Sequence, residues 1–175
     1  MLIDLLNGMR EKATENSSNT EIVISNSLEM NHELRKTVGV IRENILASRQ
    51  SILITGYAIS EFAKELIDLL ILKSTQGVRV TFLIDKDVEE SMFKAAIKLP
   101  NFKVYRFNPS DSYTHLHAKV MIFDKTRAFV SSSNLSYNGI INNIEIGILT
   151  NDKNVIKLND VLGKLVSSSY FEILN

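Results

Sequence analysis

The sequence predicts a single α/β domain in which helices flank a central sheet that is mixed and largely parallel. Between residues 51 and 107, short β-rich runs alternate with segments whose apolar residues recur at helical spacing. This β-α-β-α-β order implies right-handed crossovers and parallel strands with helices on the faces of the sheet. The chain has 175 residues, of which 45% are hydrophobic, so its size suits one domain with a buried core.

The first fifty residues precede this alternating region. We expect a short amphipathic helix over residues 1–12 and a polar linker over residues 13–20. The chain therefore divides into an N-terminal helix and linker, residues 1–20, and a single domain, residues 21–175. The next elements expected are a strand starting at Ile22-Val23-Ile24 and an amphipathic helix over 32–49.

The alternating region gives the clearest elements. Gly77 ends one helical segment, and Pro100 ends the next. Alternating or β-branched residues mark the strands between them. The expected strands are 51–57, 78–84 and 102–107, and the expected helices are 61–73 and 88–98.

The remainder of the chain is denser in strands and has no internal repeat of the first half. Apolar runs again mark the strands, and the last stretch has helical spacing. The expected strands are 118–123, 128–131 and 144–150, followed by a helix over 155–169.

Composition excludes several classes of function. The chain has no cysteine, which removes disulfides, thiolate metal sites and a cysteine nucleophile. It has 20 basic and 20 acidic residues, which argues against coating nucleic acid by bulk charge. The start lacks the pattern of a secretory signal, and the longest apolar segment, residues 66–72, contains Asp68. We therefore expect a cytoplasmic protein without a membrane association.

Three basic side chains are placed to bind an anion. His115, His117 and Lys119 alternate with apolar residues, so on a strand they point to the same face. An imidazole and an ammonium group one pleat apart suit a phosphate. His115 and His117 also form an H-x-H pair, which is a spacing that metals use, but the anion site explains both residues and we assign no metal.

Polar residues follow the next strand and complete the group. Ser132 and Asn134 lie in a Ser/Asn-rich turn whose donors can surround phosphate oxygens. Glu145 lies among isoleucines, where a lone carboxylate is costly unless it has a partner. This favours a place for Glu145 beside the basic residues.

The order of these residues resembles the phospholipase D superfamily. Its H-x-K-x4-D motif, followed by Gly-Ser, Asn and then Glu, matches the following residues: His117, Lys119, Asp124, Ser132, Asn134 and Glu145. Ser131 stands where the family has glycine, which affects the fine geometry of the turn. The resemblance covers roughly residues 35–170 and implies the α-β-α sandwich of that family, with a mixed, largely parallel sheet.

The resemblance also implies a mechanism without a metal or other cofactor. His117 would attack phosphorus to form a phosphohistidine, and Glu145 would orient its ring. A second histidine would protonate the leaving oxygen and then activate water. Lys119, Ser132 and Asn134 would bind the phosphoryl oxygens, with His115 as a peripheral contact. Asp124 is grouped with the catalytic residues, although it follows the strand and can instead support the site.

The mechanism needs two His-Lys sets, and the chain has one, as do the single-copy members of the family, which are typically nucleases. A homodimer with both sets at its interface is the simplest solution. Nucleic acid is favoured as the substrate because the segment 101–127 has a net charge of +3, which suits a polyanion, and DNA is placed ahead of RNA. This segment contains five basic residues (Lys103, Arg106, Lys119, Lys125 and Arg127) and two acidic residues (Asp111 and Asp124).

The pattern is also similar to the phospholipase D-like proteins of DISARM anti-phage systems. It resembles, less closely, the catalytic domain of metal-independent restriction endonucleases of the superfamily. These similarities imply an anti-phage role with partner proteins. Two other functions stay open at this point: a catalytically silent nucleic-acid-binding subunit of a defence complex, and a lipid phosphodiesterase.

Overall fold

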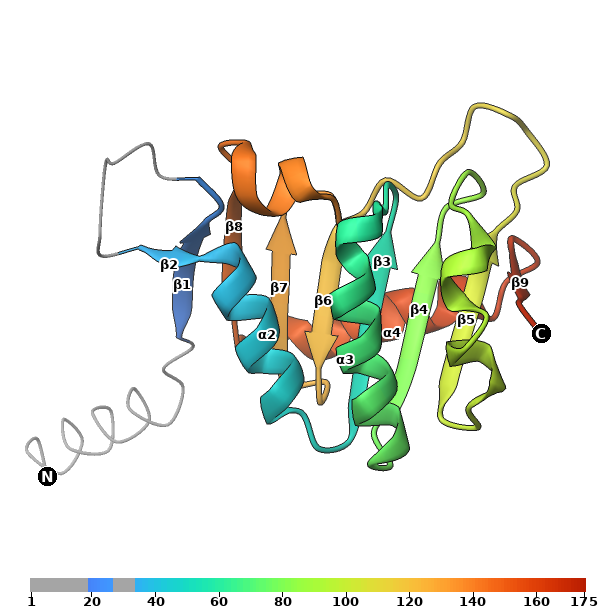
Figure 1. Cartoon of the computed structure of the whole chain (residues 1–175), viewed down its shortest axis with the longest axis horizontal. Coiled ribbons are helices and arrows are strands. Elements are labelled where there is room, and N and C mark those ends of the chain that lie inside the picture. Colours follow the sequence, from blue (N-terminus) through green and yellow to red (C-terminus); the bar gives the residue numbers. More distant parts are fainter. Residues whose placement is uncertain (1–18, 27–33) are drawn as a thin grey trace, which may run out of the picture.

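The computed structural model describes residues 19–26 and 34–175, which form one nine-stranded mixed sheet with helices on both faces (Figure 1). The strand order is β2-β1-β8-β7-β6-β3-β4-β5-β9. The strands are β1 (Thr20–Ile24), β2 (Arg35–Lys36), β3 (Ser51–Gly56), β4 (Arg79–Ile84), β5 (Phe102–Phe107), β6 (Val120–Phe123), β7 (Arg127–Ser131), β8 (Ile146–Thr150) and β9 (Phe171–Ile173). The main helices are α2 (Thr37–Ala47), α3 (Lys64–Thr75) and α4 (Asn154–Val166).

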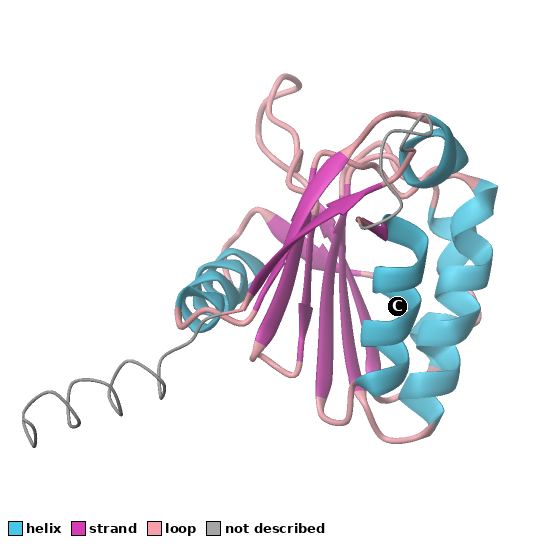
Figure 2. Cartoon of the chain, turned by 90° about the vertical axis from the view of Figure 1, so that its left-hand side faces the viewer, coloured by secondary structure: helices cyan, strands magenta, loops and turns pink. Residues whose placement is uncertain are grey.

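Two hydrophobic layers hold these elements together. Helices α2 and α3 cover one face of the sheet and α4 crosses the other (Figure 2). Adjacent residues of β4 show the division, because Phe82 packs in the layer under α2 and α3 while Leu83 packs in the layer under α4. Both side chains are fully buried. Because successive side chains of a strand point to opposite faces, this one strand contributes residues to both hydrophobic layers.

The predicted α/β architecture and the mixed sheet are confirmed, but the sheet is less parallel than expected. Strands β3, β4 and β5 are parallel, as the β-α-β-α-β order predicts, and so are β1 and β2. The other five neighbouring pairs are antiparallel. The reason is connection length: β6 and β7 are joined by a tight hairpin, which only antiparallel strands allow.

Several predicted elements have different bounds. The helix expected over 32–49 starts at Thr37, and the helix expected over 88–98 is replaced by two short 3-10 segments, Glu90–Phe93 and Ala96–Lys98. Strand β9, which pairs with β5, was not expected. Thr20 belongs to β1 rather than to the linker, and the rest of the helix and linker predicted for residues 1–20 lies, apart from Asn19, outside the described residues.

Within the described ranges, no helix combines the length and the apolar character that a membrane crossing requires.

Asp124 organises the turn between β6 and β7. Asp124 and Lys125 both have positive φ, 51° and 58°, which is the backbone geometry of a type I′ hairpin turn. The Asp124 carboxylate accepts hydrogen bonds from the backbone N–H groups of Arg49, Gln50 and Ser51, at 2.7–3.2 Å. It therefore ties the hairpin to the connection between α2 and β3.

These bonds change the acidity of Asp124. Burial alone would raise the pKa of its carboxyl, but the three backbone N–H donors, helped by the charge of Lys73, outweigh that effect and lower the pKa below its ordinary value of 3.8. A folded-state pKa below the unfolded one means that the carboxylate stabilises the fold above the unfolded pKa. The contribution is lost as pH falls through the folded pKa.

We expect Asp124→Ala to lower the free energy of unfolding by about 2 kcal/mol near neutral pH, because three N–H groups lose a charged acceptor. Asp124→Asn, which keeps one acceptor and tolerates positive φ, should cost less. Urea unfolding at about pH 7 and about pH 3 measures both effects, and the difference from wild type should shrink at the lower pH. A variant with wild-type stability at both pH values would contradict this role.

Candidate active site

The candidate site lies at the edge of the sheet where β3, β4 and β7 end and where β6 and β8 begin (Figure 1). The segment carrying the histidines is extended but precedes β6. Contrary to expectation, His117 and Lys119 therefore lie outside the strand. Thr55 of β3 holds this segment in place. Its hydroxyl donates to the Ala118 carbonyl at 2.7 Å and accepts from the Val120 N–H at 2.9 Å.

His117 and Lys119 point the same way, as the alternation predicts, and are in contact. The Lys119 Nζ lies 3.1 Å from Nδ1 and 3.3 Å from Nε2 of the His117 ring, and donates to the His117 carbonyl at 2.9 Å. His117 is exposed, whereas Lys119 is half-buried. Burial lowers the pKa of Lys119, and the nearby charge of Glu145 acts in the opposite direction.

Ser132 and Glu145 lie together beside Lys119. The Ser132 hydroxyl donates to the Glu145 carboxylate and accepts from the Ile146 N–H at 3.3 Å. The other carboxylate oxygen accepts from the Asn143 amide at 3.2 Å. Within the described part of the chain, Glu145 makes no hydrogen bond to His117, so the expected orientation of His117 by Glu145 is not seen in the single chain.

Asn134 follows β7 in the same turn. Its side-chain oxygen is buried and has no hydrogen-bond partner among the described residues. Buried polar atoms are usually paired, and exceptions gather at functional sites. Asn134 and Lys119 line one narrow cavity, together with Tyr57, which places the amide next to the basic residues.

Ser131 fits where the family has glycine, because a glycine faces it. Ser131 of β7 pairs with Gly147 of β8, and a Cβ built on Gly147 would lie 3.0 Å from the Ser131 Cβ and 2.6 Å from the ring of Phe129. The Ser131 hydroxyl accepts from the Ser133 N–H at 3.1 Å. The substitution thus adds a local bond to the turn.

His115 is held by a buried carboxylate. Asp85, which follows β4 and is 0% exposed, contacts His115 Nδ1 at 3.1 Å and accepts from the Leu116 N–H at 2.6 Å. Asp87 lies 3.8 Å from the same ring nitrogen. Asp85, Asp87 and His115 are close enough to share a cation, but both Asp85 oxygens already bind protein groups. His117 is not part of this cluster.

Asp124, which was grouped with the catalytic residues, is not at this site. It lies beyond the opposite end of β6 from Lys119 and holds backbone groups there. The H-x-K-x4-D spacing spans the whole strand, so its two ends reach opposite edges of the sheet. Asp124 is a structural residue of the motif.

Tyr57 and Asp85 are site residues that the sequence did not single out. Tyr57 follows β3, and its ring centroid lies 4.3 Å from that of His117 and 5.6 Å from that of His115. A polar or aromatic residue directly after a buried parallel strand was the available signal, since the ends of such strands meet at one edge.

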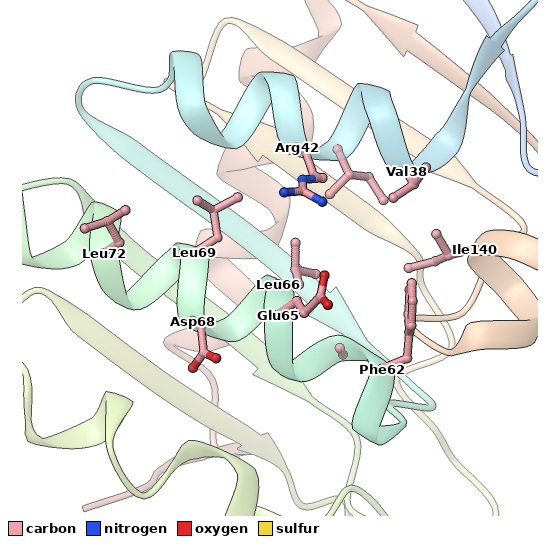
Figure 3. Close-up of a pocket in the computed structure, with 11 residues that line it drawn as sticks. Val38, Arg42, Phe62, Glu65, Leu66, Asp68, Leu69, Leu72 and Ile140 are labelled. Atoms are coloured by element: carbon pink, nitrogen blue, oxygen red, sulfur yellow. The ribbon is translucent and has the colours of Figure 1, made fainter.

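A large groove lies away from this site. It has a volume of about 630 Å³ and runs between α2 and α3 (Figure 3). Its walls are mainly apolar and also include Arg42, Glu65 and Asp68. None of the candidate catalytic residues lines it.

Comparison with known proteins agrees with the fold. Residues 41–162 match the family model described as "Cardiolipin synthase, PLD-like domain". The chain is 42% identical over 162 residues to the DISARM protein DrmC of Bacillus paralicheniformis, covering 90% of this chain and 68% of that protein.

Solved structures of low sequence identity share the fold. NucT from Helicobacter pylori superposes with a TM-score of 0.71 at 20% identity, covering 87% of this chain and 98% of that one. Nuc from Salmonella typhimurium, a phospholipase D family member, gives 0.67 at 16% identity, covering 91% and 99%. With the family model spanning more than half of the sequence, this chain belongs to the phospholipase D-like family.

Proposed function

We propose that this protein is a metal-independent phosphodiesterase that cleaves nucleic acid through a phosphohistidine. The contact between the exposed His117 ring and the Lys119 ammonium group carries the proposal. An imidazole beside a cation is suited to attack a phosphodiester, because the cation offsets charge on the phosphoryl oxygens. Ser132 and Asn134 add donors from the β7 turn, and His115 adds a peripheral contact.

The reaction has two balanced steps. In the first, a His117 nitrogen forms a bond to phosphorus, the P–O bond to the leaving group breaks, and a second histidine gives its proton to the leaving oxygen. In the second, that histidine takes a proton from water, the water oxygen bonds to phosphorus, and the P–N bond breaks. Neither step is an oxidation or a reduction, and the proposed reaction needs no metal ligand.

The second histidine is proposed to come from a second copy of the chain. Phosphoryl transfer places the attacking and leaving atoms roughly in line across phosphorus. His115 and His117 lie two residues apart on one extended segment and face the same way, so they approach a phosphate from one side. A two-fold partner can present its own His117 from the opposite side.

An exposed apolar patch next to the site supports this dimer. Ile22 of β1 pairs with Ile148 of β8, which pairs with Val130 of β7, so the three side chains form a row on one face of the sheet. Ile146 lies on the same face, one residue after Glu145. These four side chains are exposed at 58% (Ile22), 46% (Ile148), 41% (Val130) and 59% (Ile146). Contiguous apolar surface of this kind marks interaction sites.

Nucleic acid is the proposed substrate because the site lies on an open edge that a polymer can reach. The basic excess of residues 101–127 supports this less directly than expected, since Arg106 is paired with Glu90 and Arg127 bonds to Asn44. The 42% identity to a DISARM protein supports an anti-phage role with defence-system partners. DNA is proposed ahead of RNA, and the cleavage assay below compares the two.

The alternative is a silent nucleic-acid-binding subunit with the same fold. Ser131 in place of glycine keeps this alternative open, although Gly147 opposite leaves room for the serine side chain. A lipid phosphodiesterase is the third candidate, and vesicle turnover without nucleic-acid cleavage would identify it.

We expect the wild-type protein to cleave single- or double-stranded DNA or RNA in EDTA, and His117→Ala to reduce the rate by about a thousandfold or more, since it removes the nucleophile. Lys98→Ala, which changes an exposed lysine of the Ala96–Lys98 segment, is the matched control and should keep the rate. Gel assays with end-labelled substrates measure this. No cleavage by wild type, with tight binding by both proteins, would identify the silent subunit instead.

We expect wild-type protein to be dimeric by light scattering and Ile148→Lys to be monomeric and inactive, because a charge in the apolar patch opposes its burial. Leu72→Lys places the same charge on α3, on the opposite face of the sheet, and should leave the dimer and its activity intact. A wild-type monomer with full activity would contradict the shared site.

A further inference from the structure

The ring of Tyr57 is the common neighbour of the basic residues at the site. Its centroid lies 4.3 Å from the His117 ring at an interplanar angle of 60°, and 5.6 Å from the His115 ring at 88°. The Lys119 Nζ lies 5.1 Å from the same centroid. Edge-to-face ring contacts and a cation near an aromatic ring are both favourable arrangements. One aromatic ring therefore contacts three potential cations.

The position of this ring is fixed from two sides. Tyr57 follows Gly56 directly, and Gly56 is paired with Ile84 in the centre of the sheet. On the other side, His115 is anchored by Asp85, a fully buried carboxylate at the end of β4. The tyrosine ring is thus held between a rigid strand and an anchored histidine.

Among the described residues, no carboxylate is hydrogen-bonded to the His117 ring, although a nucleophilic histidine commonly has such a partner. The contacts of the His117 ring among the described residues are Lys119 and Tyr57, while the nearby Glu145 carboxylate is bound to Ser132 and Asn143. A ring that must attack phosphorus along one direction needs a fixed plane. Among the described residues, Tyr57 is the aromatic neighbour that can fix this plane.

We propose that Tyr57 is a positioning residue, which holds the His117 ring and the Lys119 ammonium group in the orientation for attack, and that Asp85 and His115 hold Tyr57. This rests on the proposed phosphodiesterase function. The aromatic ring of Tyr57, and not its hydroxyl group, does the positioning, because the hydroxyl makes no hydrogen bond among the described residues. Phenylalanine should therefore replace Tyr57, whereas leucine should not.

The test combines kinetics with a signal from the histidine rings. In EDTA, we expect Tyr57→Leu to lower kcat for nucleic-acid cleavage about tenfold with KM within about twofold, since the defect is in orientation rather than binding. Tyr57→Phe should stay within about twofold of wild type. Tyr105→Leu, which removes a half-buried tyrosine from β5, controls for general destabilisation.

Proton NMR reads the ring positions without catalysis. The chain has three histidines, so His115→Ala and His117→Ala assign the imidazole resonances of the site. We expect Tyr57→Leu to shift the His117 and His115 resonances, which lose the ring current, and Tyr57→Phe to leave them nearly unchanged. A folded Tyr57→Leu protein with wild-type kcat and unmoved His117 resonances would overturn the proposal. If wild-type protein cleaves nothing, the nuclease assignment fails, while the resonances still decide whether Tyr57 holds the ring.

Discussion

The site depends on the antiparallel pairing of β3 with β6. Ile54 of β3 lies opposite Met121 of β6, so the end of one strand meets the start of the other. Beyond the last paired residues, the Thr55 hydroxyl bonds to Ala118 and Val120 and continues the junction by a side chain. Tyr57, after the end of β3, and Lys119, before the start of β6, therefore lie next to each other. The parallel unit of β3, β4 and β5 and the antiparallel unit of β6, β7 and β8 each supply part of one active edge.

The two edges of the sheet have different tasks. At one edge, polar groups from four connections gather around His117, and some remain exposed or without protein partners. At the other, the Asp124 carboxylate is saturated by backbone N–H groups and locks the hairpin to the start of β3. His117 and Lys119 therefore lie at the reactive end of β6. Asp124, the last residue of the same motif, lies at the opposite end, where its role is structural.

Local patterns in the sequence predict most of the fold but not its long-range contacts. The parallel unit follows from alternating periods, and His117, Lys119, Ser132 and Glu145 are brought to one edge as the strand order implies. Strand β9 is only three residues long and is fixed by pairing with β5, which no local signal indicates. The Asp85–His115 contact spans 30 residues, and the role of Tyr57 depends on ring distances. Asp124 was expected to follow the strand, but the spacing alone did not decide between a catalytic and a supporting role, which its bonds to the backbone of residues 49–51 indicate.

Ser131 and Gly147 bear on how this motif can change in evolution. Among the described residues, positive φ at non-glycine positions is confined to Asp124 and Lys125, so the backbone at Ser131 does not require glycine. The space there is limited instead by the facing strand, where Gly147 leaves room for the Ser131 side chain and for the Phe129 ring. The two positions share one small volume across β7 and β8. The Phe129 ring, which a Cβ at position 147 would meet at 2.6 Å, requires glycine there whatever residue stands at position 131, so a small side chain can replace the motif glycine without a compensating change on the facing strand.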